Sequence, residues 1–222
     1  MERKMIITID GPAGSGKSTV SKVLARKLGY VYLDTGALYR ALAYKALKLR
    51  IALDDVVSLE GLCSGTKVVL KNIDGQVKVY VDGEDVGDKI RMEEVGLAAS
   101  KISTFSIVRQ SLLHLQREAG AQGGIVAEGR DMASVVFPQA DYKFYLDAAV
   151  EERINRRLNE LLGRGKHADY RTIEQDMLLR DKQDTQREIA PLKPTDDAVV
   201  IDSTDLSVTE VVEKIIQQIL NE

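Results

Sequence analysis

The sequence predicts an α/β fold built on a five-stranded parallel sheet with helices on both faces. Five short apolar runs each end in an acidic residue, and segments with helical periodicity separate them. Most runs are continuously apolar rather than alternating, as is typical of strands buried on both faces of a sheet. Ligands bind beyond the carboxyl ends of parallel strands, so these acidic residues mark the expected binding edge. The five runs are MIITID up to Asp10, VYLD up to Asp34, GIVAE up to Glu128, DYKFYLD up to Asp147, and AVVID up to Asp202.

The helices between these strands carry recognisable end signals. After the first strand, apolar residues recur at helical spacing up to Gly29, which is a candidate C-cap. Near the end of the chain, Ser207 and Glu210 have the spacing of a capping box before the periodic segment VVEKIIQQIL. Both patterns predict helices that pack one apolar face on the sheet.

Residues 66–81 interrupt this alternation with two β-type runs around the letters NIDG. In the second run Val77, Val79 and Val81 alternate with more polar neighbours, which predicts a strand with one solvated face. We expect an antiparallel hairpin, inserted into the fold and separate from the parallel core.

Residues 151–171 form the second interruption, with a helical pattern followed by Gly163, Arg164 and Gly165 and then a polar run. Glycines around a basic segment favour a helical lid that moves over a binding site. A plain solvated helix and loop explains the charge pattern equally well, so both readings stay open here.

Composition limits the classes of protein that fit. The chain has 222 residues, 44% apolar and 29% charged, with a net charge of −3, so we expect no nucleic-acid partner. Cys63 is the single cysteine and the chain has two histidines, which excludes an internal disulfide and a metal site rich in either residue. No apolar run approaches the roughly 18 residues of a membrane span. We expect a cytoplasmic monomer without a membrane partner.

The stretch after the first strand matches a phosphate-binding loop, Gly11-x-x-x-x-Gly16-Lys17-Ser18. Glycines allow the backbone N–H groups to face phosphate oxygens, Lys17 can neutralise the β- and γ-phosphates, and the Ser18 hydroxyl can hold Mg²⁺. A chance match is disfavoured because the motif follows an apolar strand and opens an apolar-periodic helix. We therefore predict ATP and Mg²⁺ as cofactors. The expected nucleotide-binding residues are Gly11, Pro12, Ala13, Gly14, Ser15, Gly16, Lys17, Ser18 and Thr19.

Other loop-bearing classes fit less well. GTP switches need Asn-Lys-x-Asp and usually Asp-x-x-Gly, and neither occurs in this chain. Motors and multi-ring ATPases are generally longer. A small chain with a lid and an insertion favours a small-molecule kinase.

Arginines follow several predicted strands and helices, where an acceptor phosphate could meet them. Arg130 and Asp131 lie just past the third strand, on the expected binding edge. Arginine suits phosphate because its planar fork donates two hydrogen bonds. Taken singly, each arginine is more often a surface ion pair, and spacing alone does not exclude that for Arg109 or Arg187.

Four motifs together resemble the bacterial cytidylate kinase family, which are nucleoside-monophosphate kinases of the P-loop kinase fold. They are the glycine loop, LDTGALYR, EGRDM and RDKQDTQREIAPL, and the likeness runs nearly end to end and includes the inserted hairpin. The resemblance implies transfer of phosphate from ATP to CMP or dCMP in pyrimidine nucleotide metabolism. The alternatives are a broad UMP/CMP kinase, another small-molecule P-loop kinase, and a regulator that binds ATP without transferring phosphate.

The resemblance also implies a role for individual residues. Cytosine is expected to contact Thr35, Ser100, Arg109 and Asp131, where Thr35 replaces the serine of other members. The acceptor phosphate is expected on Arg40, Arg130 and Arg187, and the sugar hydroxyls on Asp184. Arg180 is expected to bridge the transferring phosphates, so the catalytic group is Lys17, Arg130, Arg180 and Arg187. In the lid, the candidates for ATP contact are Arg153, Arg156, Arg157 and Arg164, with Arg153 and Arg157 favoured.

The same resemblance divides the chain into three parts. Residues 1–38, 96–150 and 172–222 form the P-loop core, residues 39–95 the region that binds the nucleoside monophosphate, and residues 151–171 the lid.

The chemistry of the bases agrees with these residue types. Cytosine has an amino donor at position 4 and an acceptor at N3, which a carboxylate and an arginine can pair, whereas uracil reverses both. Asp131 could instead cap a helix, and Asp184 could form an ion pair one turn from Arg180. A nucleotide phosphate is already nucleophilic at neutral pH, so we expect no general base, and His114 is expected to be an ordinary helix residue.

Overall fold

The computed structural model of the protein describes residues 4–73, 76–165 and 167–221. Within these ranges five strands pair in parallel in the order β2-β6-β1-β7-β8, which confirms the predicted sheet. Their bounds are β1 (Ile6–Asp10), β2 (Val31–Asp34), β6 (Ile125–Gly129), β7 (Tyr142–Asp147) and β8 (Val199–Asp202). The register places Asp34 beside Glu128 and Asp147 beside Asp202. The acidic strand ends therefore share one edge, as predicted.

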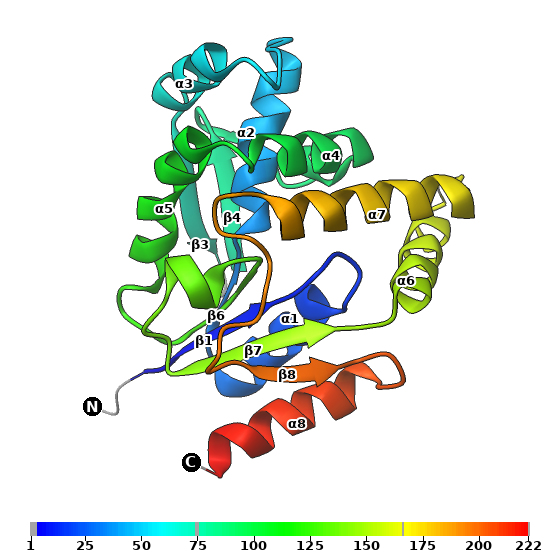
Figure 1. The fold of residues 1–222 in the computed structure, drawn as a ribbon. Helices are drawn as coiled ribbons and strands as arrows, with labels where there is room; N and C mark the ends of the chain where they lie inside the picture. The colour runs from blue at the N-terminus through cyan, green and yellow to red at the C-terminus, as the bar shows by residue number, and fades with distance from the viewer. Residues whose placement is uncertain (1–3, 74–75, 166, 222) are drawn as a thin grey trace.

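Helices cover both faces of this sheet, as Figure 1 shows. On one face lie α1 (Lys17–Leu28) and α8 (Val208–Leu220), and on the other α5 (Ser106–Gly120) and the π-helical turn η2 (Met132–Val136). Strand β6 shows why its sequence is continuously apolar. Val126 packs in the cluster with α1 and α8, whereas Ile125 and Ala127 pack in the cluster with η2 and α5.

The predicted helix ends are confirmed. Gly29 ends α1 in the left-handed region, with a φ of 65°. Ser207 and Glu210 form both hydrogen bonds of the capping box at the start of α8. His114 lies in α5, where its side chain is exposed.

The inserted segment forms a hairpin with a short third strand. Strands β3 (Val68–Ile73) and β4 (Gln76–Val81) pair antiparallel, as predicted, and β5 (Glu84–Asp85) adds a short third strand. Val79 and Val81 are buried while Lys78 is exposed, as the alternation predicted. The expectation that the hairpin stands apart from the parallel sheet is wrong at one point, because Tyr32 of β2 pairs with Gln76 of β4. The turn residues Asp74 and Gly75 lie outside the described residues.

The elements around the hairpin have a hydrophobic core of their own. They are α2 (Gly36–Lys48), α3 (Val56–Ser64), the 3₁₀ turn η1 (Lys89–Arg91) and α4 (Glu93–Ile102). Their core cluster runs from Ala37 to Leu112 and includes Ala98 and Val108. Packing therefore continues past residue 95, where the sequence placed the return to the core. The predicted three-part division stays a prediction.

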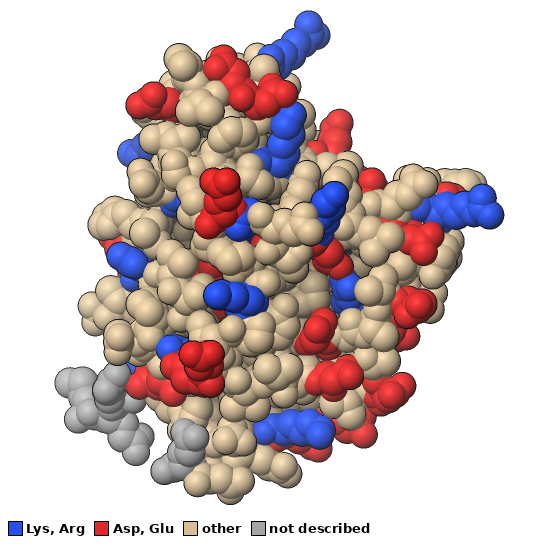
Figure 2. Space-filling view, in the orientation of Figure 1, with Lys and Arg blue, Asp and Glu red and all other residues tan. Residues whose placement is uncertain are grey.

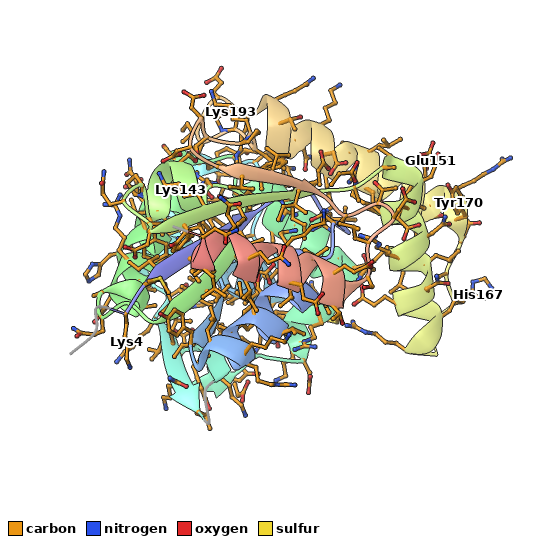
Figure 3. All side chains as sticks on the ribbon, turned by 90° about the horizontal axis from the view of Figure 1, so that it is seen from below. Lys4, Lys143, Glu151, His167, Tyr170 and Lys193 are labelled. Atoms are coloured by element: carbon orange, nitrogen blue, oxygen red, sulfur yellow. The ribbon has the colours of Figure 1, made fainter. Side chains whose placement is uncertain are left out.

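The predicted lid begins with α6 (Val150–Gly163), which is followed by α7 (Tyr170–Gln186). The two helices pack on each other through Ile154, Leu161, Ile173 and Met177. Figure 3 places His167 and Tyr170 at the end of this pair that is far from the strands. The movement of the lid stays a prediction.

The surface is mixed in charge on the face that Figure 2 shows, where Lys and Arg side chains lie among Asp and Glu side chains. Among the described residues, no helix has the length and apolar character needed to cross a membrane.

Candidate active site

A cleft of about 1910 Å³ crosses the molecule at the carboxyl edge of the sheet. Small-molecule pockets usually measure about 300–1,000 Å³, so this cleft has room for two nucleotides. Residues from the glycine loop, α2, α4, α6 and α7 line it. Most of the predicted site residues are among them, namely Ala13, Gly14, Ser15, Gly16, Lys17, Ser18, Thr19, Thr35, Arg40, Ser100, Arg109, Arg130, Asp131, Arg157, Arg180, Asp184 and Arg187. Three predicted residues do not line it, namely Gly11, Pro12 and Arg153.

The glycine loop connects β1 to α1 and depends on its glycines. A Cβ at Gly11 would lie 2.1 Å from the Leu146 carbonyl oxygen, and one at Gly14 would lie 2.9 Å from the Arg153 carbonyl oxygen. Gly14 also has a φ of 76°, which side-chain-bearing residues rarely adopt. The loop therefore packs against β7 and the lid helix through its backbone, and it leads into the N-terminus of α1, which favours anions.

Lys17 is buried at the base of the loop. Its Nζ donates a hydrogen bond to the Pro12 carbonyl oxygen at 2.7 Å. Burial, and then the charge of Arg130, lowers the pKa of Lys17 to about 7. A bound phosphate would favour the charged ammonium again, so the site is electrostatically suited to an anion.

Ser18, the predicted metal ligand, is exposed and bonds the buried carboxylate of Glu128 at the end of β6. Its Oγ donates to Glu128 Oε2 at 2.8 Å, and the Tyr32 hydroxyl donates to Glu128 Oε1. Burial, followed by the charge of Asp34, raises the pKa of Glu128. One carboxylate and one hydroxyl fit Mg²⁺, which typically takes few protein ligands and completes its shell with water and phosphate oxygens. The described residues contain no group of three or more His, Cys, Asp or Glu side chains that could hold a metal ion.

The two predicted base-reading residues Arg109 and Asp131 form a buried ion pair. Their side chains are 8% and 4% exposed, and Arg109 also donates to the Ser103 carbonyl oxygen at 3.1 Å. The Arg109 guanidinium lies 5.6 Å from the centre of the Tyr39 ring. A charged pair of this kind is costly to bury, which points to a functional reason for it.

The alternative that Asp131 caps a helix is not supported. Asp131 occupies the N-cap position of η2 but makes no side-chain capping bond. Asp10 does this instead, because its carboxylate accepts hydrogen bonds from the N–H groups of Met132 and Ala133 at 2.9 and 2.8 Å. Burial raises the pKa of Asp10 to about 6. The carboxylate of Asp131 is thereby left for the cleft and for Arg109.

Two hydroxyl residues complete this end of the cleft. Thr35 donates through Oγ1 to the Glu128 carbonyl oxygen at 2.7 Å. Ser100 donates through Oγ to Gln183 Oε1 at 2.8 Å. Both hydroxyls thus have their proton directed at a protein acceptor.

The predicted phosphate-binding arginines lie together between the loop and the base-reading pair. Arg130 Nε bonds Asp184 Oδ2 at 2.7 Å, and Arg187 Nη1 lies 3.9 Å from Asp184 Oδ1, so the charged groups that pair with Asp184 are Arg130 and Arg187 and not Arg180. Arg40 bonds Asp34 at 2.7 Å. Burial, followed by the charge of Arg130, lowers the pKa of Arg180 to about 10.

Two atoms of this cluster lack a hydrogen-bond partner. Within the described part of the chain, Arg180 Nε and Arg187 Nη2 are buried and donate no hydrogen bond. Unsatisfied buried donors cost free energy unless a ligand completes them. Both donors are available to an anionic ligand, and Arg187 Nη2 also lies 3.9 Å from Asp131 Oδ1.

Arg157 and Arg153, the two lid arginines favoured for contact with ATP, have different surroundings. Arg157 lines the cleft and pairs with Glu93 at the start of α4, which links the lid to the opposite wall. Arg153 is buried beneath the loop, where it bonds the Ala13 carbonyl oxygen at 3.1 Å and Asp181 at 2.6 Å. The predicted contact of Arg153 with ATP is not visible in this arrangement and stays a prediction.

The sequence analysis assigned no role to several residues that organise the site, among them Asp10, Tyr32, Glu128 and Gln183. The signal for two of them was present, since Asp10 and Glu128 are acidic residues at strand ends. Their partners could not be read, because Asp10 bonds residues 122 and 123 positions away.

A phosphate loop and a cluster of arginines, which line one cleft with room for two nucleotides, define the class of the protein as a P-loop kinase of small molecules. Comparison with known proteins makes this specific: the chain belongs to the cytidylate kinase family, whose family description matches residues 7–221. It is 47% identical over 212 residues to the cytidylate kinase of Geobacter sp. strain M21, covering 96% of this chain and 91% of the relative. It is 45% identical over 222 residues to that of Geobacillus sp. strain WCH70, covering 100% and 99%.

Solved structures show the same fold at low identity. The shikimate kinase of Bacteroides thetaiotaomicron is 11% identical and matches with a TM-score of 0.50, over 98% of this chain and 99% of that one. At this identity the likeness concerns the fold alone.

Proposed function

We propose that the protein transfers the γ-phosphate of ATP to CMP and dCMP, giving CDP and dCDP with ADP as the second product. The observation that carries the proposal is the buried Arg109–Asp131 pair, both members of which line the cleft. Membership of the cytidylate kinase family supports the same activity.

The base-reading pair suits cytosine. The Asp131 carboxylate accepts from the amino group at position 4, and Arg109 donates to the ring nitrogen N3. Uracil would set a carbonyl oxygen against Asp131 and an N–H against Arg109. Each mismatch of a buried group costs about 1–3 kcal/mol, and 1.4 kcal/mol is tenfold. One such mismatch is therefore expected to favour CMP over UMP by roughly fivefold to a hundredfold, and both together by more.

The arginine cluster supports transfer between two phosphates. Arg40, Arg130 and Arg187 hold the acceptor phosphate, and Asp184 contacts the sugar hydroxyls. Lys17 and Arg180 neutralise the charge that moves from ATP to the acceptor. The protein contributes position and charge rather than a general base, since the acceptor phosphate is a nucleophile already.

Mg²⁺ is proposed to be held by Ser18 with Glu128 nearby, where it would supply positive charge to neutralise the phosphates of ATP. Arg157 is proposed to contact ATP from the lid, exchanging its bond to Glu93 for a phosphate oxygen. Closure of the lid would exclude water, which otherwise competes as acceptor.

The decisive experiment measures ADP release with CMP, dCMP, UMP and AMP side by side. We expect turnover with CMP and dCMP, and a much lower kcat/KM for UMP and AMP. Equal rates with UMP would indicate a broad UMP/CMP kinase and refute the assignment of Arg109 and Asp131. No CMP-dependent ADP release would indicate a nucleotide-dependent regulator. Light scattering on the same preparation tests the expectation of a monomer.

A further inference from the structure

Gln183 of α7 bonds a residue of the cleft, although it has no role in the proposed phosphate transfer. The hydroxyl of Ser100 on α4 donates its proton to Gln183 Oε1 at 2.8 Å. Ser100 is 9% exposed and lines the cleft, whereas Gln183 is half-buried and does not line it. Gln183 is thus a partner of a cleft residue and not itself a cleft residue.

The direction of this hydrogen bond decides what Ser100 offers to a ligand. A hydroxyl has one proton and two lone pairs, and the oxygen of an amide can only accept. When the proton of Ser100 points at Gln183 Oε1, only lone pairs remain for the cleft. Without that acceptor the hydroxyl would rotate freely and could donate to a ligand as readily as it accepts.

This direction adds a second acceptor to the base-reading end of the cleft, beside the carboxylate of Asp131. The amino group of cytosine has two N–H bonds, so two acceptors can pair with it. The carbonyl oxygen that uracil has at the same position has no proton and is repelled by both.

We propose that Gln183 is a specificity-determining residue that acts through Ser100, holding its hydroxyl as an acceptor so that the site selects an aminopyrimidine over its carbonyl analogue. The proposal rests on the proposed function, because it concerns the base of the acceptor nucleotide. Gln183 is a positioning residue and touches no reacting atom.

The test compares Gln183→Leu with Gln183→Glu. Leucine removes the acceptor at similar size, so the ratio of kcat/KM for CMP to that for UMP is expected to fall roughly threefold to tenfold, the worth of one hydrogen bond. Glutamate can only accept and should keep the ratio. Its added charge next to Asp184 weakens binding of the phosphate that CMP and UMP share. At the base it favours the amino group of cytosine over the carbonyl oxygen of uracil, so the ratio should not fall. The KM for ATP should change in neither variant beyond what Gln186→Leu, an exposed position on the same helix, produces.

A double-mutant cycle with Ser100→Ala separates orientation from a general structural effect. Once the hydroxyl is gone, Gln183→Leu is expected to have no further effect on the ratio. Additive effects would overturn the proposal, as would an unchanged ratio in Gln183→Leu, or a loss in Gln183→Glu equal to that in Gln183→Leu.

If the wild-type protein prefers CMP to UMP and Gln183→Leu has the same CMP-to-UMP ratio, the proposed function stands and only this inference is refuted. A wild-type protein without CMP-dependent ADP release would overturn both. Thermal unfolding of each variant confirms that the compared proteins are folded.

Discussion

Replacement of Asp131 by asparagine tests the base-reading site most directly. Asp131 is 3% exposed and forms its ion pair with Arg109, which is 7% exposed. Asparagine keeps the size of the side chain and one acceptor oxygen, but it loses the charge and gains an N–H donor. An amide that can rotate pairs with the carbonyl of uracil as well as with the amino group of cytosine.

The expected loss of specificity follows from one charge-assisted hydrogen bond, which is worth about 1.5–3 kcal/mol. At 1.4 kcal/mol per tenfold, the CMP-to-UMP ratio of kcat/KM should fall by roughly tenfold to a hundredfold. The free energy of unfolding should also fall. Removing one partner of a buried pair costs about 3–5 kcal/mol, and we expect the lower end because Arg109 keeps its bond to the Ser103 carbonyl.

The assay is ADP release with CMP and with UMP at saturating ATP, with urea unfolding of the same preparations. Asp34→Asn is the matched control, because Asp34 ends a neighbouring strand and bonds Arg40, an expected phosphate ligand. That variant should affect CMP and UMP equally. A folded Asp131→Asn protein with an unchanged CMP-to-UMP ratio would refute the reasoning.

Three further predictions concern the loop and its supports. Lys17→Ala is expected to lower kcat by orders of magnitude without changing the CMP-to-UMP ratio, because Lys17 is proposed to neutralise the donor phosphates and not to contact the base. A changed ratio in the same assay would contradict this. For Asp10, burial raises the folded pKa to about 6 from 3.8, so its contribution to stability is complete below pH 3.8 and is lost as pH rises through 6. Between about pH 5 and pH 7.5 the wild type should therefore lose roughly 1–2 kcal/mol of unfolding free energy relative to Asp10→Asn. The same difference in unfolding free energy between the two proteins at both pH values, measured by urea unfolding, would contradict this. Arg153→Ala should lower the unfolding free energy by about 3 kcal/mol and raise the KM for ATP, because Arg153 bonds Asp181 and the Ala13 carbonyl of the loop; unaltered values of both in thermal unfolding and initial-rate measurements would show that the brace is unimportant.

Local features of the fold could be predicted because their causes are local. The glycine loop, the Gly29 C-cap and the Ser207–Glu210 capping box each depend on residues within one turn of chain, and all appear as expected. Continuous apolar runs also identified the five strands. Burial on both faces explains the runs of β1 and β6, whereas in the edge strand β8 only Ile201 is buried.

Hydrogen-bond partners that come from distant elements could not be predicted from the sequence. Whether Asp131 caps a helix or reads a base depends on Asp10, which takes the capping role from 122 positions away. Whether Asp184 pairs with Arg180 or Arg130 is likewise decided by the tertiary structure, which brings Asp184 of α7 within 2.7 Å of Arg130, 54 positions earlier in the chain. Arg153 and Arg157 lie four residues apart on α6, yet one is buried beneath the loop and the other lines the cleft.

The sequence by itself thus determined the class of fold, the phosphate loop and the set of residue types needed for two nucleotides. Only the tertiary structure decided which of those residues face one another, including Ser18 with Glu128 and Ser100 with Gln183. The physical reason is the distance along the chain over which each feature is determined. Backbone conformation and apolar periodicity are set by neighbours along the chain, whereas the direction of a hydrogen bond in a buried site is set by whichever distant element packs against it.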